Sequence, residues 1–127
     1  MTDLAAGLSA TTEHDVGADD TAIALGSGDL PVLATPRLVA WLEGAAVAAV
    51  VARLEPGSTT VGGHIAIDHL APTAVGSRVR TEATVTTVAG RTIDFEISAR
   101  EGDELIARGR HVRHVVDSDR FLARLSR

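Results

Sequence analysis

A single carboxylate, Glu43, stands inside the longest apolar stretch of the chain, which runs from residue 38 to residue 51. Charged side chains are rarely buried without a partner, and neither Arg37 nor Arg53 lies at the three- or four-residue spacing that pairs side chains on one helix. We therefore expect the partner of Glu43 to come from elsewhere in the chain or from a ligand. A carboxyl group held out of water is a candidate base or nucleophile near neutral pH. The alternative is a helix edge that faces solvent.

His69 is the histidine whose position best suits it to act together with Glu43. In the strand expected over residues 63–70, His69 alternates with Ile65 and Ile67 and so shares their face, whereas His64 and Asp68 point the other way. The apolar face should look toward the helix that carries Glu43. A lone histidine on an apolar face is more often structural than catalytic, so its candidacy depends on Glu43.

Two glycines and one arginine complete the set of candidate site residues. Gly62 and Gly63 precede the His69 strand, where bare backbone N–H groups can approach a ligand carbonyl as an oxyanion site requires. The alternative is a plain turn or bulge at the start of the strand. Arg113 shares strand parity with His111 and Val115, which predicts that it faces inward near the site. It could equally serve as a structural ion-pair former.

Other chemistries fit the sequence poorly. The histidines and acids that could hold a metal do not form a closed ligand set: His111 and His114, three apart on a strand, project to opposite faces. We therefore predict no metal site. The segment Gly26-x-Gly28 has Pro31 where a dinucleotide fingerprint needs its third glycine, and no serine has a nucleophile-elbow context.

Composition narrows the function further. The chain has 127 residues, which suits one domain, and a net charge of −5, which disfavours nucleic acid as a partner. All twelve basic residues are arginine and cysteine is absent, so lysine-based phosphate loops, Schiff bases and thiol chemistry are excluded. No secretory signal is recognisable, and the apolar stretch is shorter than the roughly 20 residues of a membrane span. We expect a cytoplasmic protein that does not contact membranes.

The elements that must position these residues are one helix and an antiparallel sheet. Thr35 is expected to cap the helix, with Pro36 at its first position, and Glu55-Pro56-Gly57 should end it. Strands are expected over residues 8–16, 63–70, 77–88, 92–100 and 104–116, and a short helical turn over about 117–125. The sequence predicts a single α+β domain over residues 1–127, with a short flexible N-terminus and a sheet wrapped around one long buried helix. A helix this apolar needs more cover than one small sheet provides, which predicts a dimer.

Two segments of the chain resemble the fluoroacetyl-CoA thioesterase-like family of hotdog-fold proteins. They are the run from Leu33 through Thr35-Pro36 to Trp41-Leu42-Glu43, and the run from Val61-Gly62-Gly63 through Asp68-His69 to Gly76. The specific feature is the combined spacing of a threonine at the helix start, a glutamate eight residues on and a histidine twenty-six residues later. The resemblance extends over residues 30–116.

This resemblance implies a hotdog homodimer that hydrolyses a small acyl-CoA at sites on the subunit interface. By position, Thr35 is the hydroxyl member, Glu43 the acid that attacks directly or activates water, and His69 the general base or acid. Gly62 corresponds to the backbone group near the thioester oxygen, and Arg113 to an arginine beside the site. Coenzyme A is then part of the substrate, and no metal or cofactor is implied.

Several alternatives stay open at this level. No aromatic residue precedes Trp41, so any lid over the site must consist of small aliphatic side chains, and a fluorinated acyl group does not follow from the resemblance. The hydroxyl of Thr35 could serve only as a helix cap. An acyl-CoA-binding hotdog module without turnover is the second hypothesis. A hotdog hydratase is a third, although no Asp/His pair for it is evident.

Overall fold

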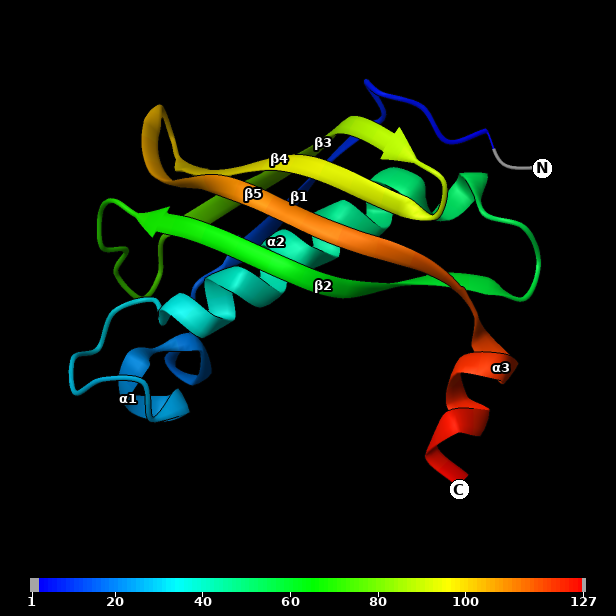
Figure 1. Cartoon of the computed structure of the whole chain (residues 1–127). Coiled ribbons are helices and arrows are strands. Elements are labelled where there is room, and N and C mark those ends of the chain that lie inside the picture. The colour runs from blue at the N-terminus through cyan, green and yellow to red at the C-terminus, as the bar shows by residue number, and fades with distance from the viewer. Residues whose placement is uncertain (1–2, 127) are drawn as a thin grey trace.

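The computed structural model describes residues 3–126, which form one curved antiparallel sheet around one long helix (Figure 1). The sheet has the strand order β1-β3-β4-β5-β2, so β1 and β2 are its two edges. The strands are β1 (Ser9–Asp15), β2 (Ser58–His69), β3 (Arg78–Ala89), β4 (Thr92–Glu101) and β5 (Glu104–Asp117). The helices are α1 (Ala22–Leu25), α2 (Thr35–Val50) and α3 (Ser118–Ala123), with short 3-10 turns at Ala18–Asp20, Val51–Arg53 and Arg124–Ser126.

The three central strands form the meander that the turn residues predict. Gly90 joins β3 to β4 and Gly102 joins β4 to β5, and their φ angles of 60° and 57° lie in the left-handed region that favours glycine. Register shifts interrupt the pairing after Val85 and after Ala99. Such irregularities bend and twist a sheet, and this sheet curves around α2 (Figure 1).

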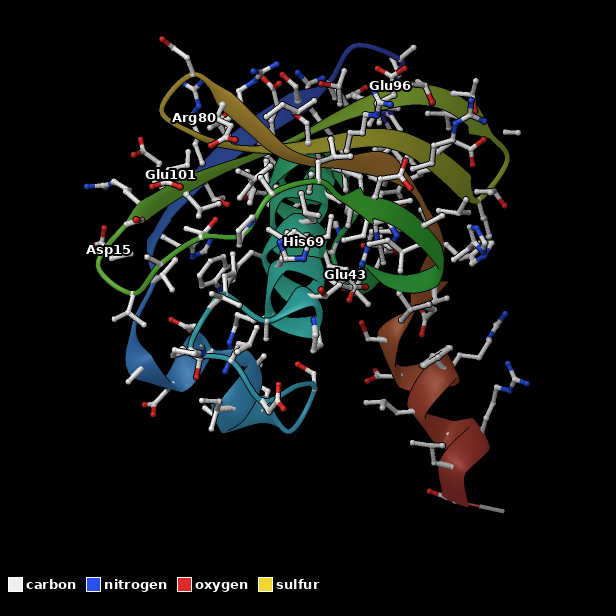
Figure 2. All side chains as sticks on the ribbon, turned by 90° about the vertical axis from the view of Figure 1, so that its left-hand side faces the viewer. Asp15, Glu43, His69, Arg80, Glu96 and Glu101 are labelled. Carbon is white, nitrogen blue, oxygen red and sulfur yellow. The ribbon has the colours of Figure 1, made fainter. Side chains whose placement is uncertain are left out.

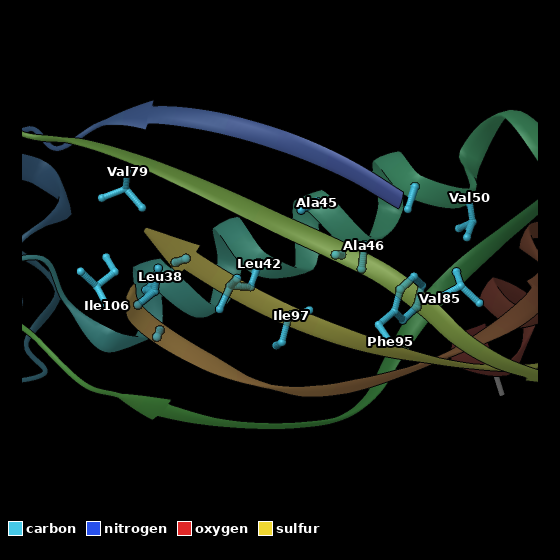
Figure 3. Packing of buried hydrophobic residues seen from close by; sticks show 14 of the residues in the cluster. Leu38, Leu42, Ala45, Ala46, Val50, Val79, Val85, Phe95, Ile97 and Ile106 are labelled. Atoms are coloured by element: carbon cyan, nitrogen blue, oxygen red, sulfur yellow. The ribbon is translucent and has the colours of Figure 1, made fainter. Parts of the chain in front are cut away.

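The core lies between the concave face of the sheet and one side of α2 (Figure 3). Strand alternation places Ile93, Phe95 and Ile97 inward, and each is at most 3% exposed. The helix contributes its buried residues to the same cluster: Leu38, Leu42, Ala45, Ala46, Ala49 and Val50. At the β1 edge the sheet and helix are joined by a stacked pair, the rings of His14 and Trp41, whose centroids lie 4.4 Å apart.

The sheet of a single chain leaves part of α2 uncovered, as the sequence predicts for a helix this apolar. The sheet covers one side of α2, and Ala40, Gly44, Val47 and Ala48 on the other side are exposed. The cause is geometric, because five strands curve around only part of the circumference of a helix. An apolar helix face therefore stays open to solvent in the isolated chain.

The predicted elements need four corrections. Helix α2 ends at Val50 and a 3-10 turn follows over Val51–Arg53, before the predicted stop at Glu55-Pro56-Gly57. The N-cap of α2 is Ala34 rather than Thr35, so the helix begins one residue earlier than expected. Strand β2 begins at Ser58, five residues before its predicted start. The short helix α1 was not predicted; Thr21 caps it by accepting a hydrogen bond from the Ala24 N–H, and Gly26 ends it in the left-handed region.

The two ends of the chain agree only partly with the sequence prediction. Asp117 accepts a hydrogen bond from the Arg120 N–H and so caps the predicted C-terminal helix α3. The apolar residues of this segment, Phe121, Leu122 and Leu125, are exposed rather than packed. The predicted flexible N-terminus falls partly on Met1 and Thr2, which lie outside the described residues.

One helical segment, Thr35–Arg53, is long and apolar enough to cross a membrane by length and composition alone. This differs from the expectation that the apolar stretch is too short, because the helical residues extend beyond residues 38–51. The segment is nevertheless the core helix of this fold, since the sheet packs along it and buries its leucines.

Replacing Phe95 by alanine should lower the free energy of unfolding by about 3–5 kcal/mol, because its ring fills the centre of the core and a cavity would remain. Denaturant unfolding followed by circular dichroism measures the change. The matched control is Glu96→Ala on the outer face of the same strand, which should stay within about 0.5 kcal/mol of the wild type. Equal effects of the two substitutions would contradict the assigned facing of β4.

Candidate active site

Thr35 and His69 form a direct pair at the N-terminal end of α2. The Thr35 hydroxyl oxygen lies 2.8 Å from His69 Nδ1, which joins the first turn of the helix to the last residue of β2. The predicted inward facing of His69 is confirmed. Because Ala34 occupies the capping position, the Thr35 hydroxyl makes no cap hydrogen bond and remains available to the imidazole. The expected alternative, a purely capping threonine, is therefore wrong.

Burial determines the chemical state of this imidazole. It lowers the pKa of His69 below the ordinary histidine value, and the backbone of Ala71 offsets the effect only partly. The Nε2 atom is buried and makes no well-formed hydrogen bond within residues 3–126. His69 thus has a neutral ring that Thr35 holds at Nδ1, while its Nε2 is enclosed in the single chain without a hydrogen-bond partner among the described residues.

A small pocket lies beside the Thr35–His69 pair, with a volume of about 340 Å³. Its polar lining consists of Ser27, Thr35 and His69, and the rest is apolar: Ala22, Val32, Leu33, Leu70, Ala71 and Pro72. Of the larger aliphatic residues before α2, which were the candidates for a lid, Val32 and Leu33 line this pocket, whereas Leu25 and Leu30 are exposed.

Glu43 has the distant partner that its position in the sequence requires. Arg113 reaches across from β5, and its Nη1 donates to Glu43 Oε2 at 3.0 Å. Arg113 is 6% exposed, and its guanidinium also donates from Nε to the Thr60 hydroxyl at 2.8 Å and from Nη2 to the Thr60 carbonyl at 3.0 Å. The Glu43 side chain is 39% exposed, so in a single chain the carboxylate is paired but not held out of water as expected.

His111 belongs to the same cluster and was missed as a site residue by reasoning from the sequence. Its Nε2 lies 3.1 Å from Arg113 Nη1 and 3.7 Å from Glu43 Oε2. Sequence reasoning weighed His111 only as a metal ligand. Its shared parity with Arg113 was the signal that could have placed it here. In the described part of the chain, no group of three or more potential ligands could hold a metal ion.

The two glycines serve opposite faces of the sheet. The pairing of β2 with β5 shifts register between Gly62 and His64, so the alternative of a bulge applies here, although it lies within β2 and not at its start. A Cβ atom on Gly62 would lie 2.5 Å from Glu43 Oε2, whereas one on Gly63 would lie 2.5 Å from Nε2 of His114, which is exposed on the outer face. Gly62 therefore leaves space for the carboxylate. An oxyanion role for either glycine stays a prediction.

Two chemical groups thus lie along α2, the Thr35–His69 pair and the Glu43–Arg113–His111 cluster, and Figure 2 labels His69 and Glu43 beside the helix. Eight residues separate Thr35 from Glu43, which is about 12 Å along a helix axis. A carboxylate, a neutral imidazole and a hydroxyl are the groups that acyl transfer to water uses. The 12 Å separation shows that they do not form one contact cluster within a chain.

Comparisons with known proteins agree with this chemistry. The model of the family named fluoroacetyl-CoA-specific thioesterase matches residues 16–119. The fluoroacetyl-CoA thioesterase of Streptantibioticus cattleyicolor is 35% identical over 94 residues, which cover 74% of this chain and 68% of that protein.

Solved structures give the same result at the level of the fold. A crystal structure of a mutant of the fluoroacetyl-CoA-specific thioesterase FlK matches with a TM-score of 0.92 and 29% identity, and covers 99% of this chain and 98% of that chain. A hot-dog-like protein from Thermanaerovibrio acidaminovorans matches with a TM-score of 0.87 and 25% identity over 94% of this chain and 89% of that one. The expected hotdog fold is confirmed, and the chain belongs to the family of fluoroacetyl-CoA-specific thioesterases.

Proposed function

We propose that this thioesterase hydrolyses the thioester of a small acyl-CoA and that Glu43, His69 and Thr35 carry the reaction. The observation that carries the assignment is the 2.8 Å contact of Thr35 with His69 Nδ1, which leaves Nε2 of a neutral ring unpaired within the described residues. A substrate linked to coenzyme A is supported by a family relative, since a mutant of FlK has been solved in complex with fluoroacetate and CoA.

Glu43 supplies the electron pair for the first step. Arg113 engages Oε2, and the half-exposed carboxylate can act on the acyl carbon directly or on a proton of the attacking water. In the direct route the Glu43 oxygen bonds to the acyl carbon as the carbon–sulfur bond breaks, and water then hydrolyses the mixed anhydride and frees the carboxylate. In the other route Glu43 takes a proton from water as the water oxygen bonds to the acyl carbon and the carbon–sulfur bond breaks. The backbone at Gly62 lies against Glu43, where an N–H donor would stabilise charge on the thioester oxygen.

His69 manages the proton that this exchange releases. The neutral ring, held by Thr35, takes a proton derived from the attacking water and delivers it to the departing sulfur, which leaves as the thiol. The carboxylic acid product loses its own proton to solvent. All of these transfers use side chains and water, so the mechanism requires no metal and no redox cofactor.

The size and lining of the pocket favour a short acyl group. About 340 Å³ of space is shared between the acyl group and its thioester linkage, and the walls beside Thr35 and His69 are short aliphatic side chains. A pocket of this kind accepts small apolar groups without providing charged partners. We extend the proposal to a cytoplasmic location, which the absence of cysteine supports, and to an enzyme without nucleic-acid or membrane partners.

A second copy of the chain completes the site. Strand β2 is an unpaired edge of 12 residues, and the exposed side of α2 lies open beside the sheet. Long open edges and apolar faces favour association. We propose a two-fold homodimer that covers this side of α2 and takes Glu43 out of water. The dimer places Glu43 of one protomer opposite the Thr35–His69 pair of its partner, which resolves the 12 Å separation within each chain.

Glu43→Gln and His69→Ala should each lower kcat for thiol release from short-chain acyl-CoAs by about 10²–10⁴-fold, because each removes a group that moves electrons or protons in the reaction. A thiol-reactive chromophore measures the rate. Asp68→Asn, next to His69 but on the outer face, is the matched control and should retain wild-type activity. Wild-type rates in all three variants would reject the assignment.

Mixing the two inactive variants tests whether the site is shared between protomers. When Glu43→Gln and His69→Ala chains are unfolded together and refolded, half of the dimers are mixed and each holds one intact site. Activity should then recover to about a quarter of the wild-type rate. If each site came from one chain, every site would carry a substitution and no recovery would occur. A stable monomer in sedimentation would also contradict the proposal.

The pH dependence of kcat/KM reports the state of His69. Burial lowers the pKa of His69, so the ring stays neutral below the usual histidine value of about 6.5. Activity that needs the neutral ring should therefore fall only at a pH below that value. The proton NMR signals of the His69 ring should titrate with the same midpoint as the fall in kcat/KM at low pH. If kcat/KM and the His69 signals shared a midpoint above a pH of about 6.5, the argument that burial lowers the pKa of His69 would be contradicted.

A further inference from the structure

The buried imidazole of His111 has no part in the chemistry proposed above. It belongs to β5, is 1% exposed and packs against the ring of Phe95 with centroids 5.9 Å apart. Both of its nitrogens are nevertheless engaged.

The contacts of His111 determine its protonation state. Nδ1 lies 2.7 Å from the carbonyl oxygen of His64, and because a carbonyl only accepts, Nδ1 must carry the hydrogen and donate it. Nε2 lies 3.1 Å from Arg113 Nη1, and because a guanidinium only donates, Nε2 must offer its lone pair. The two contacts together require the neutral tautomer protonated at Nδ1.

This tautomer gives the Arg113 guanidinium an acceptor on each side. The hydroxyl and carbonyl oxygens of Thr60 accept hydrogen bonds from Nε and Nη2 of Arg113. Its Nη1 lies between His111 Nε2 and Glu43 Oε2. A planar guanidinium held at three nitrogens cannot rotate, so the direction in which Nη1 points is fixed. That direction sets where the Glu43 carboxylate rests.

We propose that His111 is a positioning residue, which in its Nδ1-protonated tautomer orients Arg113 so that Nη1 holds the Glu43 carboxylate in its reactive place. The proposal rests on the proposed role of Glu43. A proton added at Nε2 would face the Nη1 donor and cancel the contact. Burial is the largest effect on the pKa of His111 and lowers it. The charges of Arg113 and, to a smaller extent, His64 also lower this pKa. The hydrogen bond to the His64 carbonyl and the charge of Glu43 raise it.

The kinetic test compares a variant that keeps the acceptor with one that removes it. His111→Gln has an amide oxygen near the position of Nε2, whereas His111→Leu has similar bulk and no polar atom. Misplacement of a reacting group by about 1 Å costs about 10²-fold in rate, so the leucine variant should lose kcat by about that factor while KM stays near the wild-type value. The glutamine variant should recover most of the loss. His114→Gln, on the outer face of the same strand, should match the wild type.

Coupling to Arg113 separates this role from simple core packing. Arg113→Lys removes the planar fork, so adding His111→Leu to it should cost little further activity, because both changes break the same chain of contacts. Unfolding measurements on each variant identify any loss due to stability alone. Additive losses in kcat, or equal kcat in the leucine and glutamine variants, would overturn the proposal.

A measurement on the unaltered protein keeps the proposal testable if the variants fail to fold. Nitrogen-15 NMR of the histidine ring distinguishes the two neutral tautomers, and His111 should show protonated Nδ1 and unprotonated Nε2 at neutral pH. Protonation at Nε2 would overturn the proposal without reference to activity. A Glu43→Gln enzyme with full activity would instead reject the proposed function, which the tautomer measurement does not depend on.

Discussion

The contact between Arg113 and Glu43 is the interaction on which the site depends. A partly buried carboxylate loses part of its hydration, and a paired cation offsets that cost. The cation here comes from a strand seventy residues later in the chain and is itself fixed by Thr60 and His111. The pair needs Gly62 as well, because any side chain there would occupy the place of the carboxylate oxygen. Residues from the helix and two strands thus meet at one ion pair.

The fold provides this meeting by curvature. Strands β2 and β5 pair antiparallel along most of their length, and the bulge at Gly62–Gly63 turns the inner face toward Glu43. At the other end of β2, His69 reaches the first turn of α2 and the Thr35 hydroxyl. A single strand therefore connects the two chemical groups, and its outward edge is the one left unpaired in the sheet.

Much of this arrangement was predictable from local rules. Strand alternation correctly turned His69 and Arg113 inward, and the lack of a helical partner correctly required a distant one for Glu43. The N-cap of α2 was predicted one residue too late, at Thr35 instead of Ala34, because N-cap propensity favours threonine over alanine. His111 was overlooked because parity says which face a side chain takes but not which atoms it meets. That one sheet would leave part of α2 uncovered was predictable, but which side stays open was not, since a helix of alanine, valine and leucine gives little sign of which side a sheet covers.

The spacing of Thr35 and Glu43 on one rigid helix has a consequence for communication between sites. In the proposed dimer each α2 would serve two reaction centres, with its first turn in one and its third turn in the other. A small slide of the helix that tightens one centre would then be transmitted along its length to the second, without any intervening loop. Substrate binding at one end of α2 would therefore change the geometry of the reaction centre at its other end.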